Sequence, residues 1–214
     1  MPRQCVLFDF DGVIADTERR NADYLAAALA QHGVTLSAAD RLARVGTNDR
    51  TALVELLARA PKPVGLEAFM AERRLLGNSY EDGTIQPMPG LVDFVRGLRA
   101  AGVKTGLVSS TSARLILAAL DHMGMMALFD VILCGDMVER TKPDPTCYQK
   151  AMAFLGVAPS DCVVIEDSAV GIRAGRAAGA YVIAYRGAGI PQDTREANAA
   201  ADTFAECAAL LQGG

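Results

Sequence analysis

Residues 5–16 read CVLFDFDGVIAD, a short apolar run that leads straight into two aspartates and a glycine. An apolar run without polar alternation is typical of a parallel strand that is buried on both faces of a sheet. Asp9 and Asp11 are two positions apart, so their side chains point to the same side where that strand ends. The stretch therefore predicts a buried first strand over residues 4–8 with a pair of carboxylates at its carboxyl end.

Further apolar runs of the same kind recur in the C-terminal two thirds of the chain, separated by segments of helical length. The expected strands cover residues 103–108, 131–134, 162–165 and 181–184, and the expected helices cover 91–101, 112–123, 145–155 and 170–178. Glycine follows several of these helical segments, as is common at helix C-caps. The repeated strand–helix unit predicts an α/β fold, a doubly wound parallel sheet of Rossmann-like type with ligands at the strand ends.

The segment after the first strand interrupts this rhythm. The next expected strand begins at residue 103, whereas an ordinary crossover needs about 30 residues. The surplus has helical patterns over residues 18–32, 51–60 and 66–76. We therefore expect a core domain of residues 1–16 and 86–214 with a small helical domain, residues 17–85, inserted into it. Residues 186–202 are rich in Ala, Gly and polar residues, and we expect either a loop near the site or plain surface there.

Composition narrows the functional classes. The 214 residues are 51% hydrophobic and 21% charged, with a net charge of −4, as in an ordinary soluble globular protein. An acidic chain is a poor nucleic-acid binder, and no apolar stretch is long enough to span a membrane. The five cysteines show no CxxC spacing, and no signal peptide is evident, so we expect free thiols and a cytoplasmic location. No heptad pattern indicates an oligomer; we expect a monomer, and the oligomeric state stays open.

The paired aspartates favour a cation site. Two carboxylates this close repel each other, and Mg²⁺ between them would relieve the repulsion. A solvated turn is an equal alternative for this motif alone, because Asp and Gly both favour loops.

Three further motifs follow other expected strands. Ser109, Ser110 and Thr111 come at the end of one strand, where hydroxyls and a helix N-terminus suit phosphate, although Ser and Thr are also the commonest N-caps. Lys142 lies in a proline-stiffened loop, and Glu166 and Asp167 follow another strand. A lone lysine in a loop is usually solvated, and Asp167 could be a helix cap. Taken together, the motifs indicate a Mg²⁺-dependent phosphoryl-transfer site.

The ordered set of Asp9-x-Asp11-Gly12, Ser109, Lys142-Pro143 and Glu166-Asp167 resembles the haloacid dehalogenase-like hydrolase superfamily. The helical insert resembles the cap of its β-phosphoglucomutase-like branch. The motifs extend from residue 9 to residue 167, so the resemblance covers essentially the whole chain.

The resemblance implies a role for each matching residue. Asp9 would be the nucleophile that forms an aspartyl-phosphate, and Asp11 the general acid and base. Ser109 and Ser110 would bind the phosphoryl group, and Lys142 would neutralise charge. Mg²⁺ would be held by Asp9, by the backbone carbonyl of Asp11 and by Asp167, with Glu166 as a further ligand that binds directly or through water.

Within the superfamily, the sequence favours a phosphatase. Dehalogenases lack the second aspartate, and phosphonatases carry a cap lysine that has no good counterpart here. Sugar-phosphate mutases of the β-phosphoglucomutase type remain the alternative; they tend to have a histidine where this chain has Asn21, and a Lys-Asn pair where it has residues 111–113. The substrate-specificity segment of the cap resembles residues 44–50, which makes Gly46 and Arg50 candidate substrate-binding residues. A sugar phosphate or sugar-acid phosphate is the expected substrate.

Two other classes of function share some of these residues. A phospho-accepting signalling domain also gathers carboxylates, a hydroxyl and a lysine around Mg²⁺, but the large helical insert has no place in it. A catalytically silent phospho-ligand-binding protein would have lost a motif residue, and all four motifs are intact. We therefore expect an enzyme, a Mg²⁺-dependent phosphoric monoester hydrolase.

Overall fold

The computed structural model describes residues 3–43 and 50–212. The chain divides into two compact units, one made of Met1–Asp16 with Ile85–Gly214 and one made of Thr17–Thr84. The first unit contains the sheet and the second is helical, so the chain leaves the first unit after one strand and returns to it later.

The sheet of the first unit confirms the predicted fold class. In the described residues its strands are β1 (Cys5–Phe8), β2 (Lys104–Val108), β3 (Val131–Leu133), β4 (Cys162–Glu166), β5 (Tyr181–Tyr185) and β6 (Ala199–Ala201). They lie in the order β3-β2-β1-β4-β5-β6, and every neighbouring pair is parallel. Phe8 at the end of β1 pairs with Leu107 and Ile165, so the carboxyl ends of the three central strands are level. The direction of strand order reverses at β1, where a doubly wound sheet binds its ligand.

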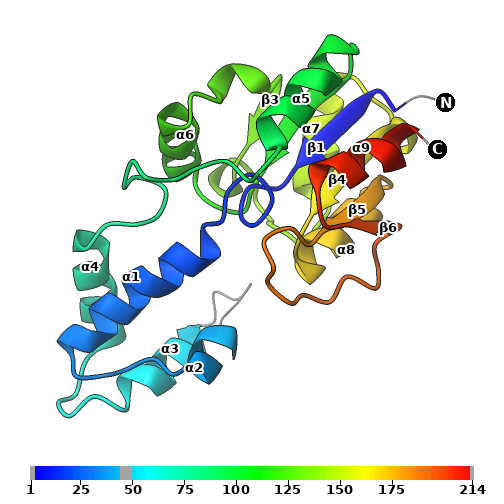
Figure 1. Ribbon diagram of the computed structural model, residues 1–214. Helices are drawn as coiled ribbons and strands as arrows, with labels where there is room; N and C mark the ends of the chain where they lie inside the picture. Colours follow the sequence, from blue (N-terminus) through cyan, green and yellow to red (C-terminus); the bar gives the residue numbers. More distant parts are fainter. Residues whose placement is uncertain (1–2, 44–49, 213–214) are drawn as a thin grey trace. The chain divides into compact units, whose positions relative to one another are not determined.

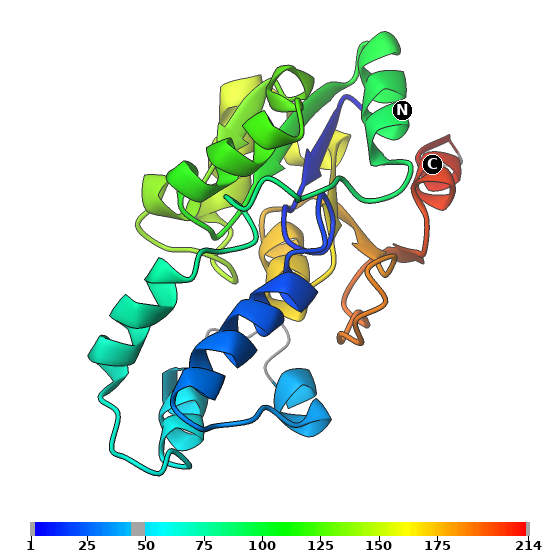
Figure 2. The same ribbon diagram turned by 60° about the vertical axis from the view of Figure 1, so that its left-hand side comes forward.

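Helices cover both faces of this sheet (Figures 1 and 2). They are α5 (Leu91–Ala100), α6 (Ala113–His122), α7 (Thr146–Leu155), α8 (Ala169–Ala177) and α9 (Phe204–Gln212). Helices α7 and α8 pack on β2 to β5, whereas α5 packs against β2 and α9. The strands are buried between these layers, which explains why their sequences are apolar at successive positions.

Alternate side chains of β1 pack on opposite faces of the sheet. Cys5 and Leu7 of β1 belong to the cluster that contains Ala151 and Ile172 of α7 and α8. Phe8 points the other way and meets Phe94 of α5 edge-to-face, with ring centroids 6.0 Å apart. All five cysteines are buried and free, as the sequence predicted.

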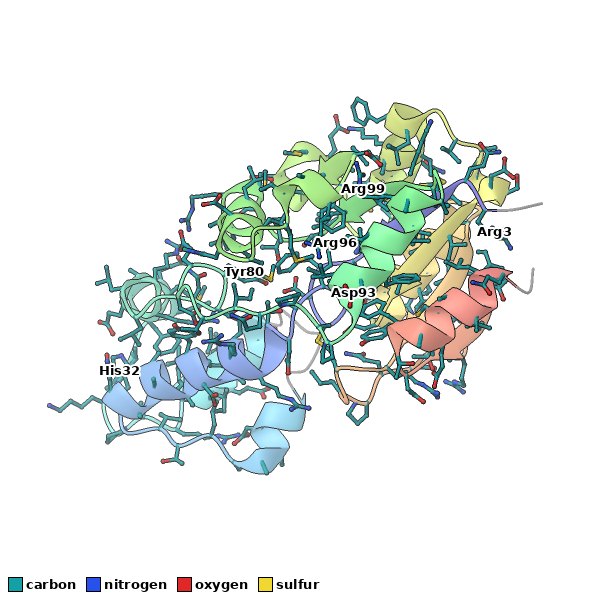
Figure 3. The ribbon with its side chains drawn as sticks, turned by 45° about the horizontal axis from the view of Figure 1, so that its top comes forward. Arg3, His32, Tyr80, Asp93, Arg96 and Arg99 are labelled. Atoms are coloured by element: carbon teal, nitrogen blue, oxygen red, sulfur yellow. The ribbon has the colours of Figure 1, made fainter. Side chains whose placement is uncertain are left out.

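Arg99 fastens the start of β2 to the loop before β3. This arginine, which Figure 3 labels on α5, donates to the carboxylate of Asp130 at 2.7 Å, and the other oxygen of Asp130 accepts the Thr105 backbone N–H at 2.8 Å. Burial would raise the pKa of Asp130, but the hydrogen bonds from Thr105 and Arg99 outweigh it and hold the pKa below its usual value.

The sequence analysis missed two elements near the C-terminus. Residues 199–201 form β6 and residues 204–212 form α9, whereas we expected only a loop or surface over residues 186–202. Three alanines have low β propensity and give no strand signal. Their strand state comes from pairing with β5, which is a tertiary contact.

The helical unit has a core of its own. It contains α1 (Glu18–Gln31), α2 (Ala38–Ala43), α3 (Arg50–Leu57) and α4 (Leu66–Leu75). Its buried cluster includes Leu29, Leu53 and Phe69, which come from three of these helices. His32, also labelled in Figure 3, pairs with Glu72 at 2.6 Å and so ties the end of α1 to α4. In the part of the chain that the structure describes, no helix has the length and apolar character of a membrane span.

Candidate active site

The candidate site lies at the carboxyl ends of the central strands. Asp9 follows β1, Ser109 follows β2, and Asp167 follows β4; the Asp9 backbone N–H continues the ladder to the Ile165 carbonyl at 3.0 Å. All three side chains are buried. The parallel register therefore places three of the predicted site residues along one edge of the sheet.

Lys142 reaches this edge from the loop before α7. Its ammonium donates to a carboxylate oxygen of Asp9, to Glu166 Oε1 at 2.7 Å and to the Val108 carbonyl at 2.9 Å. An ammonium has three protons, so all of its donors are used in this arrangement. Only 4% of the Lys142 side chain is exposed. The lysine is therefore a buried, fully hydrogen-bonded cation that bridges two carboxylates.

Glu166 is held by four donors and is completely buried. Oε1 accepts from Lys142 and from the Tyr148 hydroxyl at 2.9 Å, and Oε2 accepts from the backbone N–H of Ser168 at 3.1 Å and from its hydroxyl at 3.0 Å. The centroid of the Tyr148 ring lies 5.0 Å from the Lys142 ammonium, in a cation–π arrangement. These contacts fix the Glu166 carboxylate in place, and the carboxylate in turn anchors the Lys142 ammonium.

The buried carboxyl of Asp9 has too little positive charge around it to balance the nearby carboxylates. Burial, and then the charge of Glu166, raise the pKa of Asp9 to about 8, although Lys142 acts in the opposite direction. Burial would lower the pKa of Lys142, but Asp9 and Glu166 outweigh it and raise that pKa well above its usual value. The lysine therefore stays charged, while Asp9 needs further positive charge to be ionised at neutral pH.

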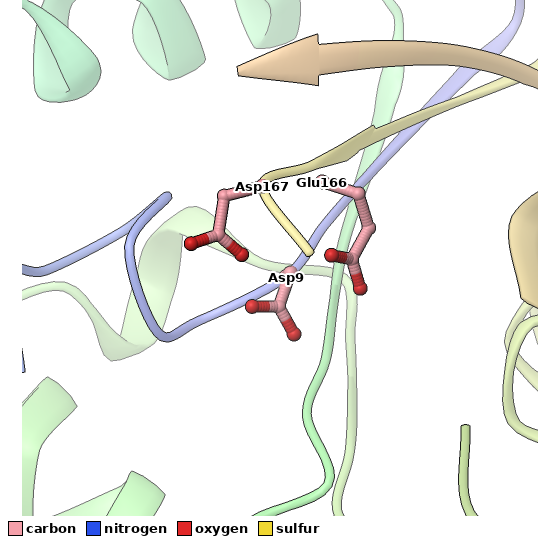
Figure 4. A group of neighbouring side chains, drawn as sticks. All are labelled: Asp9, Glu166 and Asp167. Atoms are coloured by element: carbon pink, nitrogen blue, oxygen red, sulfur yellow. The ribbon is translucent and has the colours of Figure 1, made fainter. Parts of the chain in front are cut away.

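Asp9, Glu166 and Asp167 each have one carboxylate oxygen that lies within 4.8 Å of the other two (Figure 4). Hard oxygen donors in this number suit Mg²⁺, which usually takes one or two carboxylates and keeps several waters. Gly12 lets the first turn approach Asp167, because its φ is +79° and a Cβ there would lie 2.1 Å from Asp167 Oδ2. The residues present therefore fit a divalent cation.

Asp11 is linked to the end of β2 through a threonine. Thr111 Oγ1 lies 3.3 Å from Asp11 Oδ2, and the Thr111 backbone N–H donates to Ser109 Oγ at 3.0 Å. Ser110, between them, is exposed. The structure thus connects Asp11 with the predicted phosphate-binding loop.

The predicted substrate-binding residues of the helical unit are not placed in a site. Gly46 lies outside the described residues, and for Arg50 the structure describes the backbone, which begins α3. Their proposed contacts with substrate stay predictions.

Sequence reasoning did not single out Tyr148 as functional, and it named Thr111 only as one of the hydroxyls at the end of a strand. Tyr148 looks like an ordinary core residue of α7, and its contact with Glu166 joins positions 18 residues apart. The contact of Thr111 with Asp11 joins positions 100 residues apart, so the motif alone does not reveal it.

Comparison with known families decides the class of protein. The sequence model of the haloacid dehalogenase-like hydrolase family matches residues 4–179 of this chain. The chain belongs to this family. The resemblance proposed from the four motifs is thereby confirmed, and the chain is an enzyme of the hydrolase class.

Curated relatives of this hydrolase include named phosphatases. Fructose-1-phosphate phosphatase YqaB of Escherichia coli is 33% identical over 189 residues, which cover 85% of this chain and 95% of that protein. Protein CbbY of Cereibacter sphaeroides is 30% identical over 196 residues, 86% of this chain and 84% of CbbY. A bifunctional riboflavin kinase/FMN phosphatase of Arabidopsis thaliana is 33% identical, and the matched residues span only 48% of its length. These relatives support a phosphoric monoester hydrolase.

Solved structures agree on the fold. A HAD family hydrolase from Deinococcus radiodurans, solved with phosphate and sodium, matches with a TM-score of 0.83 and 30% identity. The match covers 100% of this chain and 97% of that protein's chain. CbbY from Rhodobacter sphaeroides, solved with phosphate, has a TM-score of 0.77 and 26% identity, with 95% of this chain and 96% of CbbY covered.

Gly171→Ala tests the anchoring of Glu166. A Cβ at residue 171 of α8 would lie 1.7 Å from Glu166 Oε1, so the carboxylate must move away from Lys142. We expect a loss of about 1–3 kcal/mol in the free energy of unfolding, as for other overpacked sites. We also expect activity to fall by about 10²-fold, the cost of misplacing a catalytic group by about 1 Å.

Gly97→Ala is the matched control for this variant. Gly97 lies in α5, and no atom lies within 4 Å of the position that a Cβ would take there. A helical Gly→Ala change at such a position should raise stability by about 0.5–1 kcal/mol and leave activity unchanged. Chemical denaturation and initial rates measure both effects; equal behaviour of the two variants would contradict the anchoring role.

Proposed function

We propose that this hydrolase is a Mg²⁺-dependent phosphatase that hydrolyses a small phosphorylated metabolite through an aspartyl-phosphate on Asp9. The observation that supports this most is the buried contact of Lys142 with both Asp9 and Glu166, at the same strand ends as Asp167. A carboxylate that attacks an anionic ester needs this much positive charge beside it.

In the first step, a carboxylate oxygen of Asp9 attacks phosphorus, and the bond between phosphorus and the ester oxygen breaks. Asp11 gives its proton to that leaving oxygen, so the alcohol leaves neutral. In the second step, Asp11 takes a proton from water, the resulting hydroxide attacks phosphorus, and the Asp9–phosphorus bond breaks. Inorganic phosphate is released, and both aspartates return to their starting protonation states.

The other residues bind and orient the phosphoryl group. Lys142 neutralises charge on Asp9 and on the phosphoryl oxygens, while Ser109 and Ser110 donate to those oxygens. Ser109 Oγ accepts the Thr111 backbone N–H, which leaves its own hydroxyl proton for a ligand.

We assign the direct metal contacts to Asp9, to the Asp11 backbone carbonyl and to Asp167. When bound, Mg²⁺ supplies charge neutralisation to Asp9 and to the phosphoryl group. Both oxygens of Glu166 already accept two hydrogen bonds each, so we assign it the anchoring of Lys142 and at most a contact to the ion through water.

We further propose that the substrate is a sugar phosphate or sugar-acid phosphate. YqaB is named for fructose-1-phosphate, another relative from Thermotoga maritima is named a phosphorylated carbohydrates phosphatase, and a CbbY structure holds xylulose-1,5-bisphosphate. In this proposal the helical unit acts as a cap, where Gly46 lines the substrate site and Arg50 pairs with a second anionic group.

One contact in the helical unit favours hydrolysis over the mutase alternative. Asn21, which stands where mutases of this type tend to have histidine, faces the buried Ser79 hydroxyl, with 2.8 Å between Ser79 Oγ and Asn21 Oδ1. An amide has no proton that it can give up near neutral pH, so Asn21 cannot replace a histidine in proton transfer.

The direct test is phosphate release from a panel of sugar phosphates and sugar-acid phosphates, with Mg²⁺, with EDTA, and with Mg²⁺ restored after EDTA. We expect release with Mg²⁺, a loss on the order of 10²-fold or more with EDTA because several kcal/mol of charge stabilisation disappear, and recovery on restoring the ion.

Two other outcomes would contradict the proposal. Conversion of hexose 1-phosphates to 6-phosphates with little free phosphate would establish the mutase. Binding of phosphate esters without turnover of any of them would establish a phospho-ligand-binding protein.

A further inference from the structure

Thr111 contacts both Asp11, the proposed general acid, and Ser109, a proposed phosphate-binding residue. Its hydroxyl oxygen is 3.3 Å from Asp11 Oδ2, and its backbone N–H donates to Ser109 Oγ. The contact to Asp11 is long for an O–H···O hydrogen bond, as catalytic contacts often are before substrate binds. The residue joins the loop after β1 to the loop after β2, which are 100 positions apart in sequence.

The backbone of Thr111 is fixed by contacts of its own. The Gly135 N–H donates to the Thr111 carbonyl at 2.9 Å. Gly135 also packs tightly on the preceding residue, because a Cβ there would lie 2.1 Å from the Ser110 carbonyl oxygen. The loop after β2 is thus held against the turn after β3, and the Thr111 side chain starts from a defined position.

We propose that Thr111 is a positioning residue for Asp11, an inference that rests on the proposed phosphatase function. Its hydroxyl donates to Asp11 Oδ2, and in this proposal Asp11 Oδ1 carries the proton that goes to the leaving oxygen. A hydrogen bond to one oxygen limits the orientations that a carboxyl can take, which lowers the entropic cost of reaching the transition state.

This role predicts a dependence on the leaving group. An alkoxide is a poor leaving group, so an alkyl phosphate needs a proton from Asp11 as its ester bond breaks. A p-nitrophenolate is stable as an anion and leaves without that proton. Because kcat/KM reports the steps up to departure of the leaving group, the comparison isolates proton donation from the later hydrolysis of the aspartyl-phosphate.

The experiment compares Thr111→Val, which removes the hydroxyl and keeps the shape, with Thr111→Ser, which keeps the hydroxyl. The substrates are the best alkyl phosphate from the panel and p-nitrophenyl phosphate. For Thr111→Val we expect kcat/KM to fall by about 10²-fold with the alkyl ester, within the range for general acid catalysis, and to change little with the aryl ester. Thr111→Ser should restore the alkyl activity.

Two further variants calibrate the result. Asp11→Asn should show the same selectivity for the aryl ester with a larger loss on the alkyl ester. Thr35→Val, an exposed threonine of the helical unit, should match the wild type with both substrates.

Each remaining outcome is decisive. Equal losses on both substrates with Thr111→Val would overturn the proposal and assign the hydroxyl to phosphate binding or to folding. Unchanged kcat/KM on both would overturn it as well. If the wild type hydrolyses neither ester, the proposed phosphatase function itself fails, which the wild-type arm shows before any variant is made.

Discussion

Asp9→Asn is expected to abolish Mg²⁺-dependent phosphate release, with a fall in kcat of at least about 10⁴-fold, as for other members of a catalytic unit. The amide keeps the size of the side chain but is a far weaker nucleophile and lacks the charge that pairs with Lys142 and the metal. Substrate binding should survive, because the phosphoryl-binding hydroxyls and Lys142 remain. Initial rates and equilibrium binding of the best substrate measure the two effects.

The same variant tests the covalent intermediate. Rapid acid quench of the wild type during turnover, followed by intact mass measurement, should show a phosphorylated chain, and Asp9→Asn should show none. Asp121→Asn, on an exposed position of α6, is the matched control and should behave as the wild type in both assays. Phosphorylation of the Asp9→Asn chain would place the nucleophile elsewhere.

Lys142→Met is expected to lower kcat/KM by about 10²–10³-fold, the usual cost of removing one group that stabilises the transition-state charge. The variant also leaves Asp9 and Glu166 buried without their shared cation. Breaking a buried ion pair from one side typically costs about 3–5 kcal/mol of stability, so the variant needs a denaturation curve beside its kinetics.

Tyr148→Phe keeps the lysine and removes only one hydrogen bond to Glu166. A hydrogen bond to a charged group contributes about 1.5–3 kcal/mol, so we expect an activity loss of about 10-fold in a chain that still folds. Lys150→Met, at an exposed position of α7, is the matched control for Lys142→Met and should behave as the wild type. If Tyr148→Phe matches the wild type, the anchoring of Lys142 through Glu166 is wrong.

Much of the site could be read from the sequence because three of its four motifs directly follow an apolar strand. Asp9, Ser109 and Asp167 come immediately after β1, β2 and β4, and parallel pairing brings such positions to one edge. The role of Glu166 could not be read in this way. Its sequence position suggests a metal ligand, and only the structure shows that its two oxygens accept four hydrogen bonds, from Lys142, Tyr148 and Ser168.

The C-terminal elements show the same limit. Helix α9 and strand β6 follow a stretch without a clear period, and β6 consists of three alanines. Pairing with β5 and stacking of Phe204 on Tyr185, with centroids 4.5 Å apart, give this region its structure. Such contacts depend on residues far away in the chain, which a local pattern does not contain.

The sequence by itself determined the doubly wound core, the helical insert and the set of groups that carry the proposed chemistry. It did so because strand burial and charge are local properties of short segments. Only the tertiary structure decided which partner each group has: Lys142 between Asp9 and Glu166, the Tyr148 ring beside Lys142, and Thr111 beside Asp11. These pairings arise where loops from separate strands meet, and the distances between their atoms follow from packing rather than from spacing along the chain.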